Sequence, residues 1–120
     1  MFEELNIGSP SILVDSEGLI LEANSSMSEI FGYDRQELKG QHINVLIPEN
    51  LRDKHSIGFS NFNSGKKNNM NCFRVKGLKK NGDELFLTIS VSKQKHTLLA
   101  VMKNTTKNER LERTLLAKLG

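Results

Sequence analysis

The stretch from Leu19 to Gly40, LILEANSSMSEIFGYDRQELKG, decides the fold of this chain. Its first residues, Leu19–Glu22, alternate in a way that predicts a strand with one face more buried than the other. Asn24 or Ser25 can then cap a helix, because a short side-chain oxygen satisfies an unpaired amide at a helix start. The stretch therefore begins as a strand that leads directly into a helix.

The helix after this cap is short and has one apolar stripe. Met27, Ile30 and Phe31 lie at helical spacing on that stripe. Gly32 stands where the first helix should end, and Gly40 stands where a second helical turn should end. The pattern thus predicts a strand and two short helical segments, each closed by a glycine.

The same residues resemble the signature of PAS sensory domains, in which an asparagine precedes a hydrophobic-Gly-Tyr-x-x-x-Glu-Leu-x-Gly pattern. The matching residues are Asn24, Phe31, Gly32, Tyr33, Glu37, Leu38 and Gly40. The resemblance extends from about Ile12 to about Thr106. It implies an α+β fold, a five-stranded antiparallel sheet with helices packed on one face and a C-terminal signalling helix.

The composition fits one small domain. The 120 residues have room for a single core. The net charge is +3, and the one cysteine, Cys72, excludes an internal disulfide. Neither a membrane span nor a signal peptide is evident, so we expect a cytoplasmic protein with no direct membrane insertion. The mild, scattered positive charge does not predict nucleic-acid binding. We expect an N-terminal cap at 1–10, the PAS domain at 11–104 and a C-terminal helical linker at 105–120.

Turn signals place the remaining strands. Ser11 to Val14 reads as a first strand, and the turn ending at Gly18 leads into the second strand. Two later strands flank Asn81-Gly82, a strong hairpin signal, and a last strand covers Thr97 to Met102. Together these segments make five strands.

The alternation in the later hairpin predicts which side chains face the core. Phe73 and Val75 should point inward and Arg74 outward. In the following strand the aliphatic set should be covered, namely Leu85, Leu87, Ile89 and Val91. The space between this sheet face and the helices is the candidate binding site.

A longer helix should begin near Pro48 and end near Asn63-Ser64-Gly65. One of its faces should carry Leu51, His55, Phe59 and Phe62, which follow at spacings of four, four and three residues. His55 is thus expected to point inward among apolar neighbours.

The run Ile47-Pro48-Glu49-x-x-Arg52-x-x-His55 resembles the oxygen-sensing haem PAS domains of the FixL type. That resemblance implies His55 as an axial ligand of haem iron, since a neutral imidazole can supply such a ligand. The alternative is a structural histidine, because PAS domains without haem also carry Arg-x-x-His on this helix. In the haem domains an arginine before the hairpin turn can bind oxygen, but counting back from Gly82 places Phe73 at that position. A one-residue bulge in this strand would instead turn Arg74 inward.

The residues expected to line the candidate site are His55, Asn71, Phe73, Phe59, Ile89, Val91 and Leu99. Asn71 would be the hydrogen-bonding candidate on the distal side. Asn71-Cys72 invites comparison with the flavin-binding LOV branch, but there the cysteine follows the glycine after Glu-Leu. Here that position leads into Gln41-His42-Ile43, so flavin-thiol chemistry is not expected. A flavin held without a thiol stays open as an alternative.

Enzymatic activity is not expected. The spacing of a metal site is not found among the three histidines and the cysteine, which are His42, His55, His96 and Cys72. The sequence also shows neither a phosphate-binding loop nor a nucleophile elbow. Asn104-Thr105-Thr106 stands where PAS domains often carry an Asp-Ile-Thr-like exit motif, although the aspartate is missing. Beyond it the leucines repeat every four residues, at Leu111, Leu115 and Leu119.

Three functions are compatible with the sequence. The resemblance implies a sensory module of a larger regulator, such as a histidine kinase, a cyclic-dinucleotide enzyme or a chemoreceptor, which senses a small ligand and relays the signal through the C-terminal helix. The second is a cofactor-free interaction module, and the third is a haem-based gas or redox sensor. We expect a homodimer in each case.

Overall fold

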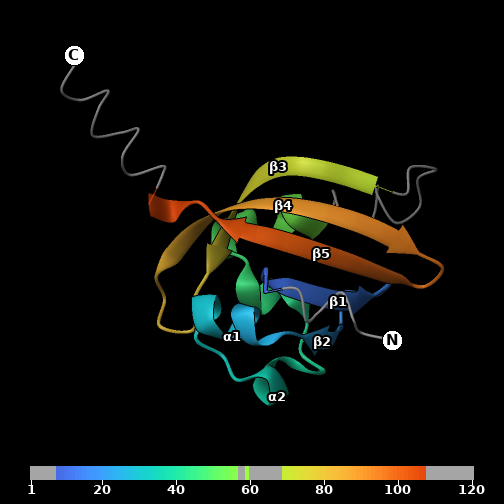
Figure 1. Cartoon of the computed structure of the whole chain (residues 1–120), viewed down its shortest axis with the longest axis horizontal. Helices are drawn as coiled ribbons and strands as arrows, with labels where there is room; N and C mark the ends of the chain where they lie inside the picture. Colours follow the sequence, from blue (N-terminus) through green and yellow to red (C-terminus); the bar gives the residue numbers. More distant parts are fainter. Residues whose placement is uncertain (1–7, 57–58, 60–68, 108–120) are drawn as a thin grey trace, which may run out of the picture.

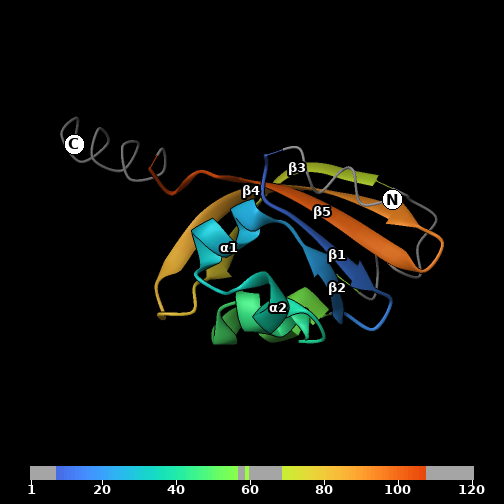
Figure 2. The same ribbon diagram turned by 60° about the horizontal axis from the view of Figure 1, so that its bottom comes forward.

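The computed structural model describes residues 8–56, 59 and 69–107. Five strands form one antiparallel sheet in the order β2-β1-β5-β4-β3 (Figure 1). The strands are β1 (Ser11–Asp15), β2 (Ile20–Ala23), β3 (Asn69–Leu78), β4 (Glu84–Gln94) and β5 (Thr97–Asn104). In Figure 2 the helical segments gather beneath one face of this curved sheet. The predicted α+β architecture is confirmed.

The β1–β2 hairpin forms as the turn residues predict. The Gly18 amide donates to the Asp15 carbonyl, and Gly18 has a φ of 89°, which favours glycine. In β2 Ile20 is buried and Leu21, on the other face, is exposed, as is Leu19 just before the strand; Ala23, at the end of the strand, is buried as well. One face of this strand is therefore buried, as expected.

Helix α1 (Ser25–Phe31) begins at Asn24 and ends at Gly32. The Asn24 side chain accepts from the Met27 amide, and Gly32 is left-handed with φ 83° and ψ 7°. Helix α2 (Arg35–Leu38) follows after three residues. Of the two predicted caps, the structure selects Asn24.

The core lies between the helices and the covered sheet face. The helices contribute Met27, Phe31 and Leu38 to the core, and the first hairpin contributes Ile12 and Ile20. Other buried members come from the later strands, namely Leu85, Leu87, Val91, Leu98, Ala100 and Met102. Burial of these side chains is the main favourable term in folding such a domain.

The segment around Pro48 is less regular than the predicted single helix. It contains two 3₁₀ turns, η2 (Ile43–Leu46) and η3 (Glu49–Leu51), followed by helical residues 52–56 and 59. Pro48 is the extended residue before η3, because its fixed φ suits the start of a helix and its missing N–H costs nothing there. Phe62 and the predicted helix end at 63–65 lie outside the described residues.

Strands β3 and β5 depart from the simple alternation in two details. The register of β3 shifts by one residue between Met70 and Phe73, so a bulge interrupts the pattern there. Strand β5 continues past the predicted end at Met102 to Asn104. The predicted N-terminal cap falls largely on residues 1–7 and the predicted signalling helix on 108–120, and both ranges lie outside the described part. Within the described part, no helix has the length and apolar character needed to cross a membrane.

Candidate functional site

The candidate site is formed by helical residues 52–56 and 59 and by the covered face of the sheet, because Phe59, Phe73 and Ile89 pack against the same core. His55 is half-buried, and its ring centroid is 6.0 Å from that of Phe59, with the rings tilted by 31°. Phe59 is partly buried and packs against the core. The helix therefore presents one imidazole and one aromatic ring to an apolar environment.

His55 is held in the neutral form near neutral pH. Burial lowers the pKa of His55 below 6.5, and repulsion from His42 lowers it further. Neutral imidazole can accept or donate a hydrogen bond, and it is also the form that ligates iron. His55 thus has the chemistry of a ligand contact without carrying a charge.

The sheet side of the site consists of Phe73, Ile89 and Val91. Phe73 pairs with Ile89 across β3 and β4, and both are partly buried against the core. Val91 is buried. Arg74 is exposed, so the inward position on β3 belongs to Phe73 and not to the arginine.

Leu99 does not join this lining. Val91 is buried and pairs with Ala100 on β5, and Ala100 and Leu98 are buried as well. Since neighbouring side chains of a strand point to opposite faces, half-buried Leu99 lies on the face away from the helices. This is contrary to its predicted place in the pocket.

The side chain of Asn71 is outside the described part of the structure, so its distal role stays a prediction. The bulge changes the register around it, because Met70 pairs with Val91. Sequence alternation could not reveal this, since a bulge adds one residue without a reliable sequence signal.

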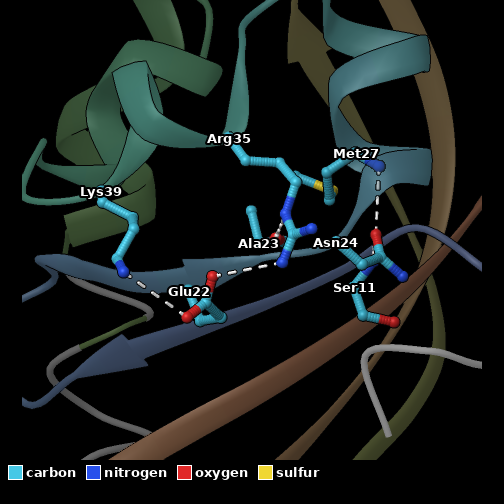
Figure 3. A network of polar contacts seen from close by, with 7 residues as sticks. All are labelled: Ser11, Glu22, Ala23, Asn24, Met27, Arg35 and Lys39. Carbon is cyan, nitrogen blue, oxygen red and sulfur yellow. Dashed lines mark hydrogen bonds and ion pairs between the residues drawn. The ribbon is translucent and has the colours of Figure 1, made fainter. Parts of the chain in front are cut away.

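A buried asparagine ties the start of the sheet to α1 (Figure 3). Asn24 Oδ1 accepts from the Ser11 amide at 3.0 Å and from the Met27 amide at 3.1 Å. Its Nδ2 donates to the Ser9 carbonyl at 2.7 Å. Asn24 therefore fixes three segments at once, which explains why an asparagine suits this position better than a simple capping serine.

Arginine 35 joins α2 to β2 in the same view (Figure 3). Arg35 Nε donates to the Ala23 carbonyl at 2.8 Å, and its Nη2 lies 3.5 Å from Glu22 Oε1. Lys39 Nζ lies 3.7 Å from the other oxygen of Glu22. Sequence reasoning missed this network, because Glu22 and Arg35 are far apart in the chain and have no distinctive spacing.

A second contact joins α2 to the β3–β4 hairpin. Lys80 Nζ lies 2.7 Å from Glu37 Oε2, and the Lys80 amide donates to the Phe31 carbonyl at 2.9 Å. The other oxygen of Glu37 accepts from the Asp34 amide at 2.9 Å. The hydrogen bond from Lys80 is the largest cause of a lowered pKa for Glu37. The hairpin tip is thereby held against the α1–α2 corner.

The exit of the chain from β5 is held by β4. The Thr105 amide donates to the Phe86 carbonyl at 2.8 Å, and the Phe86 amide donates to Thr106 Oγ1 at 3.0 Å. Asn104 Oδ1 accepts from the Thr106 amide at 3.1 Å and lies 2.7 Å from Thr106 Oγ1. Asn104 thus supplies an acceptor oxygen where the sequence lacks the usual aspartate.

Among the described residues, no group of three histidine, cysteine, aspartate or glutamate side chains could hold a metal ion. The candidate site is thus a group of apolar side chains with the half-buried imidazole of His55 beside Phe59, and its strand β4 also contacts the chain exit.

Comparison with known proteins gives the family. A PAS fold family model matches residues 4–114. The chain is 28% identical over 93 residues to a probable serine/threonine-protein kinase from Dictyostelium discoideum, covering 76% of this chain but only 6% of the kinase.

Two solved PAS domains have similar folds. One, from Colwellia psychrerythraea, gives a TM-score of 0.75 at 16% identity, covering 86% of this chain and 91% of the other. The PAS domain of the quorum-sensing receptor RpfR from Cronobacter turicensis, in complex with BDSF, gives a TM-score of 0.72 at 15% identity, covering 82% and 95%. With the family model spanning nearly the whole sequence, the chain belongs to the PAS family.

Proposed function

We propose that this PAS sensory module binds a small, mainly apolar molecule between the helical segment carrying His55 and the covered face of β3 and β4. The lining favours such a ligand, because Phe59, Phe73 and Ile89 offer apolar contacts and His55 offers one neutral hydrogen-bonding group. The receptor domain in complex with BDSF has the same fold, which supports the binding of a small molecule in this domain.

One observation carries the relay part of the proposal. Strand β4 contributes Ile89 and Val91 to the candidate site and holds the chain exit through both backbone groups of Phe86. A ligand that shifts β4 would therefore shift Asn104 and Thr106 as well. The output is an effector region of a larger regulator, of the histidine kinase, cyclic-dinucleotide enzyme or chemoreceptor kind.

A thermal-shift titration with medium-chain fatty acids and short alcohols tests binding. We expect a concentration-dependent rise in melting temperature, because a ligand that binds only the folded state stabilises it. The variant Ile89→Phe should abolish the rise by filling the site, and Leu99→Phe, on the opposite face of the sheet, should retain it. A rise that is equal in both variants would place binding elsewhere.

A haem sensor is the second candidate. It is favoured by the neutral, half-buried imidazole of His55, whose donor chemistry fits an axial ligand of haem iron. In that case Phe59 and Phe73 would pack on the macrocycle, and the bound haem would supply gas or redox sensing. Reconstitution with hemin should give a sharp Soret band that is lost or shifted in His55→Ala, while His96→Ala keeps it. The absence of such a band would exclude this candidate.

Homodimer formation belongs to the same proposal and would also serve a cofactor-free interaction module. It is supported by half-buried apolar residues on the face of the sheet opposite the helices, namely Leu13, Leu99 and Val101. Leu13 and Leu99 are direct cross-strand neighbours, so they form a continuous apolar surface. Leu99→Lys should weaken dimerisation in a concentration series of mass measurements. A wild-type protein that stays monomeric at high concentration would contradict the dimer.

A further inference from the structure

A polar groove is formed by α1, α2 and β2, from residues that do not belong to the candidate site. Its volume is about 580 Å³, within the range of about 300 to 1,000 Å³ that small-molecule sites have. The residues that line it are all polar or charged, and the neutral ones are Ser25, Ser28 and Gln36. Because polar groups lose free energy when an apolar surface covers them, this lining favours a polar occupant.

The charged residues of the groove are two cations and two carboxylates, namely Arg35, Lys39, Glu22 and Asp34. In Figure 3 the side chains of Arg35 and Lys39 both point toward Glu22. Arg35 Nη2 lies 3.5 Å from one carboxylate oxygen of Glu22, and Lys39 Nζ lies 3.7 Å from the other. Direct hydrogen bonds between charged groups are shorter, about 2.7 to 2.9 Å. Glu22 therefore compensates both cations only in part.

The guanidinium of Arg35 is held in place at this groove. Its Nε donates to the Ala23 carbonyl at 2.8 Å, which fixes the plane of the group. A guanidinium has five N–H donors, so the terminal nitrogens still have donors for a carboxylate after the Nε bond is made. The side chain of Arg35 is 49% exposed, and that of Lys39 is 43% exposed. Both cations are thus oriented and accessible to a ligand from solvent.

Ser28 adds a hydroxyl that has no other use. Its Oγ is buried and has no hydrogen-bond partner among the residues that the structure describes. Buried polar side-chain atoms usually have such a partner. Rotation about the Cα–Cβ bond of Ser28 breaks no hydrogen bond, so the hydroxyl can turn toward a ligand in the groove. A polar ligand then supplies the partner that the protein itself does not.

We propose that this groove binds a small zwitterion with one carboxylate and one ammonium group, such as a free α-amino acid. Its carboxylate lies at Arg35 and Lys39, and its ammonium group lies at Glu22 and Asp34. A ligand with a single charge fits less well, since an anion also faces both carboxylates of the groove and a cation also faces both basic side chains. The module then has a polar ligand site in addition to the apolar one.

An NMR titration of the ¹⁵N-labelled full chain tests the proposal, with glycine, L-serine and L-glutamine as the probes. At least one of them should give saturable amide shifts centred on Glu22, Ser28 and Arg35. Acetate and methylamine carry only one of the two charges each, so neither should reproduce these shifts at the same concentrations. Ile89→Phe, which fills the apolar site, should leave the titration unchanged, so the two sites are tested independently.

Two charge-removing variants at exposed positions test the assigned contacts. Lys39→Met and Asp34→Asn should each raise the Kd of the bound amino acid about five- to tenfold, the amount that one lost charged contact corresponds to. Asparagine also suits the start of a helix, so Asp34→Asn keeps α2 intact. The matched controls are Lys103→Met on β5 and Glu29→Gln on α1, both exposed and outside the groove, and they should bind like wild type.

Three outcomes would overturn the proposal. The first is the absence of saturable shifts with all three amino acids. The second is binding of acetate or methylamine as tight as that of the amino acids, which would make the groove a site for a single charge. The third is a set of shifts centred on His55 and Ile89, which would place the amino acid in the apolar site.

Discussion

Gly77 of β3 lies directly against the ring of Phe31, the last residue of α1. A Cβ added at Gly77 would be 2.9 Å from Phe31 Cε1 and 3.0 Å from Leu87 Cδ1. Phe31 is 1% exposed, so its ring has no room to withdraw. This contact seats the helix that begins at Asn24 on the strand that carries Phe73.

We therefore predict that Gly77→Ala destabilises the domain by about 1 to 3 kcal/mol, the usual cost of overpacking a core. Urea unfolding monitored by circular dichroism measures this cost. In a Phe31→Leu background the same alanine should cost clearly less, because the nearest ring atoms are gone. Equal costs in both backgrounds would show that the contact with Phe31 is not the cause.

Asn24→Ala should destabilise the domain by about 2 to 3 kcal/mol. The change leaves the buried Ser11 amide without its acceptor and removes the cap of α1. Asn24→Ser keeps a capping oxygen for the Met27 amide but loses the donor to the Ser9 carbonyl, so its cost should be smaller. Thermal unfolding of these variants beside the exposed Asn50→Ala measures the order, and an alanine cost no larger than that of Asn50→Ala would refute it.

The contact between Glu37 and Lys80 should be visible in a carboxyl titration. The pKa of Glu37 is lowered below 4.5, first by the hydrogen bond from Lys80. A carboxyl whose pKa is lowered on folding stabilises the native state above its unfolded pKa, and this stabilisation is lost as the pH falls through the folded pKa. In Lys80→Met the Glu37 pKa should rise toward 4.5, measured by carboxyl-detected NMR. An unchanged titration would show that the two side chains do not pair in solution.

His55 should titrate below the ordinary value of 6.5, because burial lowers its pKa and His42 lowers it further. A histidine whose pKa is lowered on folding stabilises the native state at higher pH, and this contribution is lost as the pH falls from the unfolded pKa through the folded one. His42→Asn should raise the pKa of His55 part of the way, since burial remains. NMR of the ring Cε1 protons measures both values, and a His55 pKa at or above 6.5 would contradict its burial.

The exit junction should depend on the hydroxyl of Thr106. Thr106→Val removes the acceptor of the Phe86 amide and the partner of Asn104, so exchange of the Phe86 amide should become faster by about five- to tenfold. Thr106→Ser keeps the hydroxyl and should exchange like wild type. Equal exchange in the valine and serine variants would show that water satisfies this amide.

The sequence predicted the elements that depend on local chemistry. The cap at Asn24, the glycine ends at Gly32 and Gly40, and the inward side of Phe73 all follow from short patterns that the structure confirms. Contacts between distant segments left no such pattern, as with Arg35 on the Ala23 carbonyl. Leu99 was misplaced because an apolar residue alone does not reveal its face, and only its pairing with Leu13 and Ser92 assigns it.

The relay through β4 is tested most directly by amide exchange at Phe86 and Thr106 after a change in the candidate site. Ile89→Phe fills the site from the covered face of β4, and Leu99→Phe adds the same kind of ring on the opposite face of β5. If β4 relays the state of the site to the chain exit, exchange at Phe86 and Thr106 should change in Ile89→Phe and match wild type in Leu99→Phe. Unchanged exchange in Ile89→Phe, in a variant that is folded, would contradict the relay.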